Sequence, residues 1–352
     1  MDILDSFYDL DFSKIDFKER KKSITNKNTI VQGPSQSGKS YLVYDYLSQF
    51  NTNDYLYVDF NNLKINDILF YQDIQEFINI NNITILALDN FDFTLGLPQC
   101  NSIIITTNVN INLNNFTNLI LTPADFEEFL LFDKHQNITT SFNYFLKFGN
   151  FIETIQTDEK HKSINIQNHI KLLATNETDL FILRYLIKNS GEIKSQNQLY
   201  LALKKEIKIS KDRFYNYCRI LEENQTITFL PKYKHSKAAK KIYTYNHALI
   251  SEVSFKKNFN NIFTNMVFLE LKNKYDEIYY DDYIDFYIPT TNEIILSKPF
   301  FIGSQISSKV IAFIEEYNIK KITIVTVSND NDIYLDNIEC EVNPFYIWAV
   351  EE

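Results

Sequence analysis

A run of eight residues combines the side chains and glycines that are needed to hold a phosphate chain. Glycines let backbone N–H groups converge on oxyanions, a lysine neutralises the terminal phosphates, and a hydroxyl can bind a divalent cation. All of these occur in the required order, in Gly33, Pro34, Ser35, Gln36, Ser37, Gly38, Lys39 and Ser40. A strand-like run precedes them and a helix-compatible run follows, which is the context of a true phosphate-binding loop. We therefore expect ATP or ADP to bind here with Mg²⁺, and Ser40 to be one metal ligand.

A second group of polar residues is expected near this loop. Asp89 follows a strongly apolar run, so it should stand at the carboxyl end of a strand and complete the Mg²⁺ shell. The next residue is Asn90, which can orient a water molecule but cannot accept its proton, and this predicts slow hydrolysis. Asp92 or Asp59 could act as the base instead, although each is also typical of a strand-end surface carboxylate.

Asn108 is a further candidate because it follows the strand-like run 102–106. It could contact the γ-phosphate or the attacking water as a sensor, or it could simply favour a turn, and both interpretations stay open. The sequence has no arginine between Arg20 and Arg184, so the nucleotide region itself offers no evident arginine finger.

Elements that would position these residues can be read from apolar periodicity. Short apolar runs alternate with helix-compatible segments, which predicts a parallel sheet covered by helices. The five expected strands are 29–32, 55–58, 83–88, 102–106 and 119–121. The nucleotide domain is expected to span 1–130, and the helical, aromatic segment 131–175 to form a lid.

The segment 194–241 is unusually basic, with a local charge of +8 in a chain whose net charge is −10, which leaves −18 for the remainder. It lies within three helical patterns and a hairpin pattern over 176–250, the order of a winged helix-turn-helix. A basic module of this kind favours contact with double-stranded DNA, while a three-helix connector that binds a protein partner is the competing interpretation. The candidate nucleic-acid residues are Lys211, Arg213, Lys232, Lys234, Lys237, Lys240 and Lys241.

Composition excludes several other classes of protein. The chain has 352 residues, 45% of them hydrophobic, which suits two or three globular domains. Its three cysteines are far apart, so a disulfide framework or zinc ribbon is not expected. No apolar run approaches the length of a bilayer span, and we expect a soluble cytoplasmic protein with no membrane partner.

With the loop and Asp89 in place, the chain resembles bacterial and archaeal AAA+-type ATPases that neighbour the origin-recognition and STAND groups. Segments 121–130 and 263–271 also resemble, respectively, the segment that closes that family's ATPase sheet and the helix that opens its last domain. The resemblance implies an α/β fold: a P-loop AAA+-like parallel sheet with a helical lid, a winged helix-turn-helix, and a C-terminal mixed α/β restriction-endonuclease-like domain over 251–352.

In that last domain the family places an Asp on one strand and an acid-x-Lys pattern on the next, where they bind a divalent metal. The matching positions here are Asp285 and the tripeptide 296–298. Leu296 supplies no oxygen ligand, and Thr264 stands where the family usually has a Glu. The resemblance therefore implies a nuclease-like fold in which cleavage has been lost.

Three functional hypotheses follow from these patterns. The first is a slow or nucleotide-gated ATPase coupled to binding of DNA or a protein partner. The second is a non-enzymatic interaction scaffold in which ATP is structural. The third is a metal-dependent nuclease that uses ligands outside the family pattern.

Overall fold

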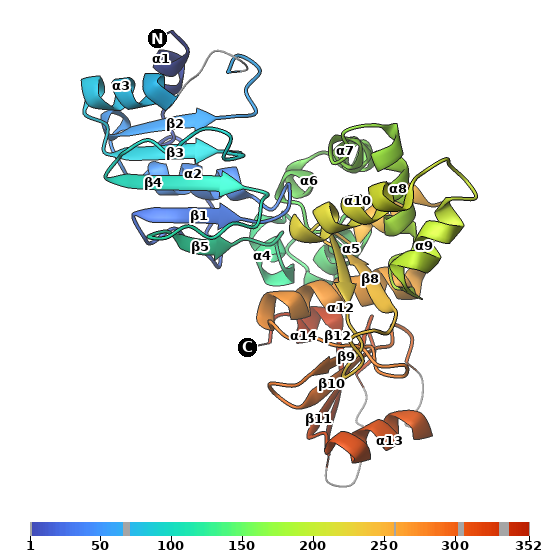
Figure 1. The fold of residues 1–352 in the computed structure, drawn as a ribbon. Helices are drawn as coiled ribbons and strands as arrows, with labels where there is room; N and C mark the ends of the chain where they lie inside the picture. The colour runs from blue at the N-terminus through green and yellow to red at the C-terminus, as the bar shows by residue number, and fades with distance from the viewer. Residues whose placement is uncertain (1, 66–70, 257, 302–305, 331–337, 352) are drawn as a thin grey trace. The chain divides into compact units, whose positions relative to one another are not determined.

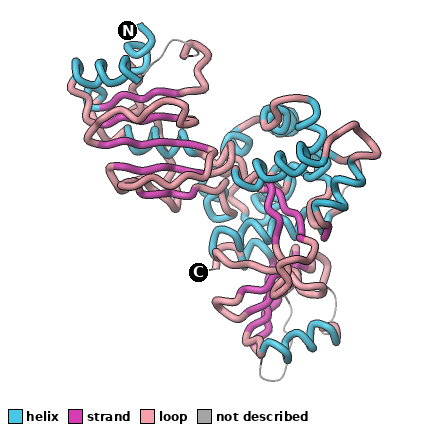
Figure 2. Tube along the Cα trace, in the orientation of Figure 1, coloured by secondary structure: helices cyan, strands magenta, loops and turns pink. Residues whose placement is uncertain are grey.

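The computed structural model describes residues 2–65, 71–256, 258–301, 306–330 and 338–351, and the chain divides into two compact units. The first unit is Met1–Pro123 and the second is Ala124–Glu352. Figure 2 shows strands and helices in both units. No helix within the described residues has the length and apolar character that a membrane crossing requires.

The first unit is a five-stranded sheet with helices. Its strands are β1 (Asn28–Gln32), β2 (Tyr55–Asp59), β3 (Ile85–Asp89), β4 (Ser102–Thr107) and β5 (Thr117–Ile120). Its helices are α1 (Asp2–Tyr8), α2 (Lys39–Leu47) and α3 (Tyr71–Asn81), with a 3₁₀ turn at Thr52–Asp54. The sheet order is β2-β3-β4-β1-β5 and every neighbouring pair is parallel, which confirms the expected parallel sheet (Figure 1).

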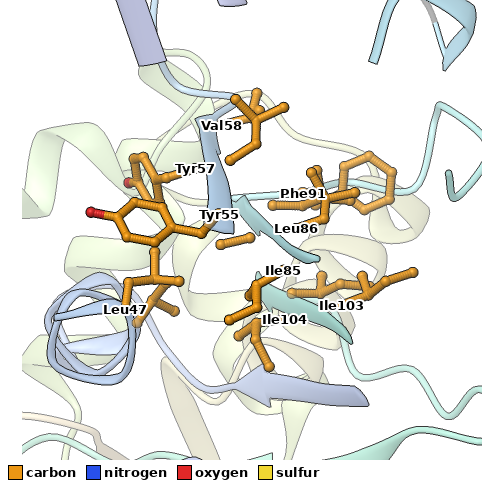
Figure 3. Packing of buried hydrophobic residues seen from close by; sticks show 14 of the residues in the cluster. Leu47, Tyr55, Tyr57, Val58, Ile85, Leu86, Phe91, Ile103 and Ile104 are labelled. Atoms are coloured by element: carbon orange, nitrogen blue, oxygen red, sulfur yellow. The ribbon is translucent and has the colours of Figure 1, made fainter. Parts of the chain in front are cut away.

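Burial explains why these segments form strands. Every residue of β3 and β4 is buried, because each of these strands lies between two neighbours in the sheet. Of the two edge strands, β5 is mostly exposed, whereas β2 is mostly buried. Figure 3 shows Tyr55 and Tyr57 on the same side of the sheet as Leu47, with Val58 and Phe91 on the other. Successive side chains of β2 therefore pack on opposite faces of the sheet.

The second unit begins with a helical group. These helices are α4 (Phe126–Phe132), α5 (Ile138–Phe148), α6 (Ile152–Gln156) and α7 (Glu159–Leu172). The ring of Phe126 lies 5.2 Å from that of Phe145 and 5.6 Å from that of Phe345, centroid to centroid. The expected lid helices therefore share a core with the C-terminal part of the chain, and the first unit ends at Pro123, before the predicted boundary at residue 130.

The middle of the second unit combines three helices and a small antiparallel sheet. In chain order these elements are α8 (Glu177–Lys188), β6 (Ile193–Lys194), α9 (Gln196–Leu203), α10 (Lys211–Glu223), β7 (Ile227–Leu230) and β8 (Lys240–Thr244). The sheet order is β6-β8-β7. Ser195 and Gln198 form a reciprocal capping box at α9, and Ser210 accepts a hydrogen bond from the Arg213 N–H at the start of α10.

The last part of the second unit is a four-stranded mixed sheet with helices. Its elements are α11 (Ala248–Val253), α12 (Phe259–Lys274), β9 (Phe286–Ile288), β10 (Glu293–Ser297), α13 (Ser308–Tyr317), β11 (Lys321–Thr326), β12 (Glu339–Pro344) and α14 (Phe345–Trp348). The sheet order is β12-β11-β10-β9, antiparallel only between β9 and β10. Outside these strands, Tyr279 and Tyr280 form isolated bridges, with Tyr287 and Lys232 respectively.

Candidate functional site

The loop between β1 and α2 is held in a conformation that depends on its glycines. Gly38 has φ 90° and caps α2, and Gln36 also takes a left-handed conformation at φ 62°. A Cβ on Gly33 would lie 2.0 Å from the carbonyl oxygen of Leu121, so only glycine fits beside that backbone. The side chain of Lys39 therefore starts from a tightly fixed backbone.

Lys39 is buried beneath this loop, with only 5% of its surface exposed. Its Nζ donates to the carbonyls of Gly33 at 3.0 Å and Pro34 at 2.9 Å, and to Oδ1 of Asn108 at 2.7 Å. None of these acceptors, which are the ones recorded among the described residues, is a carboxylate. Burial lowers the pKa of Lys39 to about 8, and the charge of Asp89 opposes that shift. The result is a desolvated ammonium group that an anion would stabilise.

Asn108 reaches this lysine because β4 lies between β1 and β3 in the sheet. The carboxyl ends of parallel strands meet at one edge, so a residue that follows β4 is placed between the loop and Asp89. The hydrogen bond brings the side chain of Asn108 into direct contact with Lys39.

Asp89 ends β3, and its carboxylate is 1% exposed. Oδ2 accepts a hydrogen bond from the Tyr57 hydroxyl at 2.6 Å, and Oδ1 accepts one from the hydroxyl of Thr106. Burial, followed by the charge of Asp89, raises the pKa of Tyr57 far above its ordinary value. Tyr57 therefore stays protonated and holds the carboxylate as a donor.

Asn90 is fixed both by its backbone and by its side chain. It has φ 56°, and its N–H donates to Oγ1 of Thr106 at 2.9 Å. Its Nδ2 donates to Oδ1 of Asp59 at 2.9 Å. Asp59 and Asp89 pair in register at the ends of β2 and β3. The predicted residue Asn90 is thus joined to a carboxylate that the sequence offered only as one alternative.

Arg20 is a functional candidate that sequence reasoning missed. Its guanidinium is buried and donates to the carbonyl of Ser37 at 3.0 Å and to that of Thr122 at 3.2 Å. It therefore joins the loop 33–40 to the chain beyond β5. The only available signal was that Arg20 is one of four arginines in the sequence.

The seven candidate nucleic-acid residues fall into two groups. Lys211 and Lys237 are exposed, and Lys234 is exposed with its Nζ 4.5 Å from the centroid of the Tyr317 ring. The other four lie within 4 Å of a carboxylate oxygen: Arg213 at 2.8 Å from Asp179, Lys232 at 2.8 Å from Asp282, Lys240 at 3.9 Å from Glu222, and Lys241 at 3.0 Å from Asp285. The first group is available to a polyanion, whereas the second already has negative partners.

Asp285 lies on the wall of a cavity of about 400 Å³ in the second unit. Its carboxylate accepts from Nζ of Lys241 and from the Ser297 N–H, both at 3.0 Å, and Nζ of Lys298 lies 3.7 Å away. Leu296 contributes an apolar wall to the same cavity. No cluster of three His, Cys, Asp or Glu side chains suited to a metal occurs among the described residues. Asp285 therefore already has two lysine partners, Lys241 and Lys298.

Comparisons with known proteins find similar proteins at low sequence identity. No family model matches the chain. An uncharacterized protein of Methanocaldococcus jannaschii is 24% identical over an alignment that covers 72% of this chain and 68% of the relative. A solved structure, a Walker-type ATPase of Pyrococcus abyssi, is matched over 65% of this chain and 91% of its own, with 13% identity and a TM-score of 0.42. Neither similarity carries a functional assignment, and we take the site from the residues of this chain.

Proposed function

We propose that this chain binds ATP or ADP at residues 33–40. The observation that carries the proposal is Lys39, a buried ammonium group whose recorded partners among the described residues are uncharged oxygens. Burying a cation without a directly bonded anion is costly, and terminal phosphates would supply negative charge in contact with it. The buried hydroxyl of Ser37, which has no hydrogen-bond partner in the described part of the chain, also fits a loop built around a polar ligand.

The residues of the site also fit Mg²⁺. Ser40 lies in the first turn of α2 and offers a hydroxyl, and Asp89 offers a carboxylate fixed by two hydroxyl donors. Mg²⁺ prefers such oxygen ligands and keeps several of its waters, so Asp89 would hold it through water. The bound ion would neutralise charge on the phosphates.

We further propose slow or nucleotide-gated hydrolysis, because Asn90 occupies the position after Asp89 and cannot accept a proton. Phosphate release by the purified wild type should be slow but should exceed that of Lys39→Ala. Release equal in the two proteins would contradict hydrolysis and favour a structural nucleotide.

For the middle of the second unit we propose a winged helix-turn-helix that contacts double-stranded DNA. What supports it is the order of α8, β6, α9 and α10 followed by the β7–β8 hairpin, together with exposed Lys211 and Lys237. Cross-links to a DNA duplex should fall within 176–250. Cross-links concentrated elsewhere would contradict this role.

A scaffold that binds a protein partner is the second candidate, and one observation favours it. Arg213, Lys232 and Lys241 already pair with carboxylates of the same chain, which reduces the charge available to DNA. Co-purification of a protein only in the presence of ATP, together with equally poor DNA binding at low salt by the wild type and lysine variants, would support the scaffold.

For 251–352 we propose a restriction-endonuclease-like domain without cleavage. The pairing of Asp285 with Lys241 and Lys298 supports this, since a metal would have to compete with a buried lysine and a half-exposed one for this carboxylate. Nicking of plasmid DNA that requires Mg²⁺ or Mn²⁺ and is lost in Asp285→Asn would contradict it.

A further inference from the structure

Hydrolysis at the proposed nucleotide site needs a group that takes a proton from the attacking water. We propose that Asp59 is this general base and that Asn90 is the residue that positions it. This proposal rests on the proposed nucleotide site. The motivating observation is the hydrogen bond of 2.9 Å from Asn90 Nδ2 to Asp59 Oδ1. Asn90, the residue after Asp89, would thus act through Asp59 at the end of the neighbouring strand β2.

The fold places Asp59 beside the proposed metal site. Asp59 is the last residue of β2, and it pairs in register with Asp89, the last residue of β3. Both carboxylates therefore stand at the edge of the sheet where β1 runs into the loop. Asp59 is half-buried, so it is fixed by its surroundings and still reachable by water.

The hydrogen bonds leave one oxygen of Asp59 for chemistry. Asn90 Nδ2 and the Asn61 N–H, at 2.9 Å and 3.0 Å, both donate to Oδ1. No donor to Oδ2 is recorded among the described residues, so this oxygen can accept a proton. Asn90 holds the pair rigidly because its own N–H is bonded to Thr106.

Other carboxylates near the site have different roles. Both oxygens of Asp89 accept hydroxyl donors. Asp92 is exposed, and its Oδ1 accepts from the Thr94 N–H at 3.0 Å and from the Thr94 hydroxyl at 2.7 Å, so it caps its own turn. These hydrogen bonds lower the pKa of Asp92, which makes it a weaker base.

The step balances without a further reactant. Oδ2 of Asp59 takes one proton from the attacking water molecule, and the oxygen of that water forms a bond to the γ-phosphorus. The bond from that phosphorus to the bridging oxygen breaks, and ADP leaves with the electron pair. The proton on Asp59 then passes to solvent, which restores the carboxylate.

An exchange of the two side chains tests the proposal. Asp59→Asn should lower kcat by about 10²-fold or more, the usual contribution of a general base. Its melting temperature should still rise with Mg-ATP, because the loop is intact. The double variant Asp59→Asn/Asn90→Asp keeps a carboxylate and an amide in the same pair, and it should recover part of the lost turnover.

Two further variants separate positioning from structure. Asn90→Ala should lower kcat while leaving KM unchanged, because Asn90 orients the base and does not touch the nucleotide. Asp92→Asn should keep wild-type turnover, since the amide oxygen can still accept from Thr94 and this carboxylate takes no part in the reaction.

The outcomes distinguish failure of the role of Asp59 from failure of the nucleotide site. Wild-type turnover in Asp59→Asn with the ATP-induced shift preserved would overturn the role of Asp59 and leave the nucleotide site standing. No recovery in the double variant would overturn the pairing with Asn90. A wild type that binds ATP but hydrolyses no more than Lys39→Ala would show that no base acts, and a wild type that does not bind ATP would overturn the proposed function itself.

Discussion

Two lysines show how differently the two units use a buried cation. In the first unit, Lys39 is buried against carbonyl and amide oxygens. In the second unit, Lys241 is buried against the carboxylate of Asp285, which Lys298 also approaches. In the first arrangement no carboxylate is recorded in direct contact with the ammonium group, whereas in the second Lys241 already has a carboxylate partner. The difference indicates which of the two polar sites is built for a phosphate ligand.

The largest expected effect concerns the loop that holds Lys39. Gly33→Ala should lower the free energy of unfolding of the first unit by about 3 kcal/mol, because its Cβ would overlap the Leu121 carbonyl. Gly96→Ala is the matched control in the same unit: its Cβ would lie 3.4 Å from the Tyr71 ring, an ordinary contact. Urea unfolding measures both, and equal stabilities would show that the loop is not tightly packed.

Loss of Lys241 should destabilise the second unit, because this lysine pairs with Asp285. Lys241→Met should lower the free energy of unfolding by about 2–3 kcal/mol, because it leaves Asp285 partly buried with a weaker partner. Lys298, with 49% of its side chain exposed, provides the control, and Lys298→Met should cost under about 1 kcal/mol. A larger effect at Lys298 would reverse the roles of the two lysines.

Acid should weaken only the second unit through its histidines, because residues 1–123 contain none. Burial lowers the pKa of His169 to about 4, so the folded state holds it neutral while the unfolded chain takes up a proton below its ordinary value of 6.5. Its stabilising contribution is present above that value and is lost as pH falls toward 4. Between pH 7 and pH 5 this loss should reach about 2 kcal/mol. Unfolding curves of His169→Gln should lack this part of the pH dependence, and identical slopes would contradict it.

The smallest expected effect separates exposed from paired lysines on the basic module. If the module binds DNA, Lys237→Ala should reduce the slope of log affinity against log salt by about one counter-ion, as for a lysine that contacts a phosphate. Lys241→Ala should leave that slope unchanged, because its charge already pairs with Asp285. Equal changes in the two variants would show that the ion pair opens on binding.

Local patterns in the sequence predicted much of the fold. Strong apolar runs located β1 to β5. β3 begins at Ile85 and not at residue 83, because the Ile83 N–H donates a hydrogen bond to the carbonyl of Ile78 at the end of α3. The two-residue strand β6 was not predicted, since its pairing with β8 gives almost no sequence signal.

The candidate site could be predicted only in part. The residues of the loop have a characteristic spacing and Asp89 follows a strongly apolar run, so the sequence located both, and their roles stay predictions. The contacts from Arg20 to Ser37, and from Asn90 to Asp59, join residues that are far apart in the chain. Pairings of this kind depend on how the strands are ordered in the sheet, which no local pattern contains.

The melting temperature with and without Mg-ATP tests the nucleotide site most directly. At a nucleotide concentration of about 100 times Kd, the folded state should gain about 2.7 kcal/mol and the transition of the first unit should rise by roughly 10 °C. Lys64→Ala, which removes an exposed lysine of the same unit, should keep this shift, and Lys39→Ala should lose it. A folded wild type that shows no shift at millimolar nucleotide, or a Lys39→Ala variant that shifts as much as the wild type, would contradict the site.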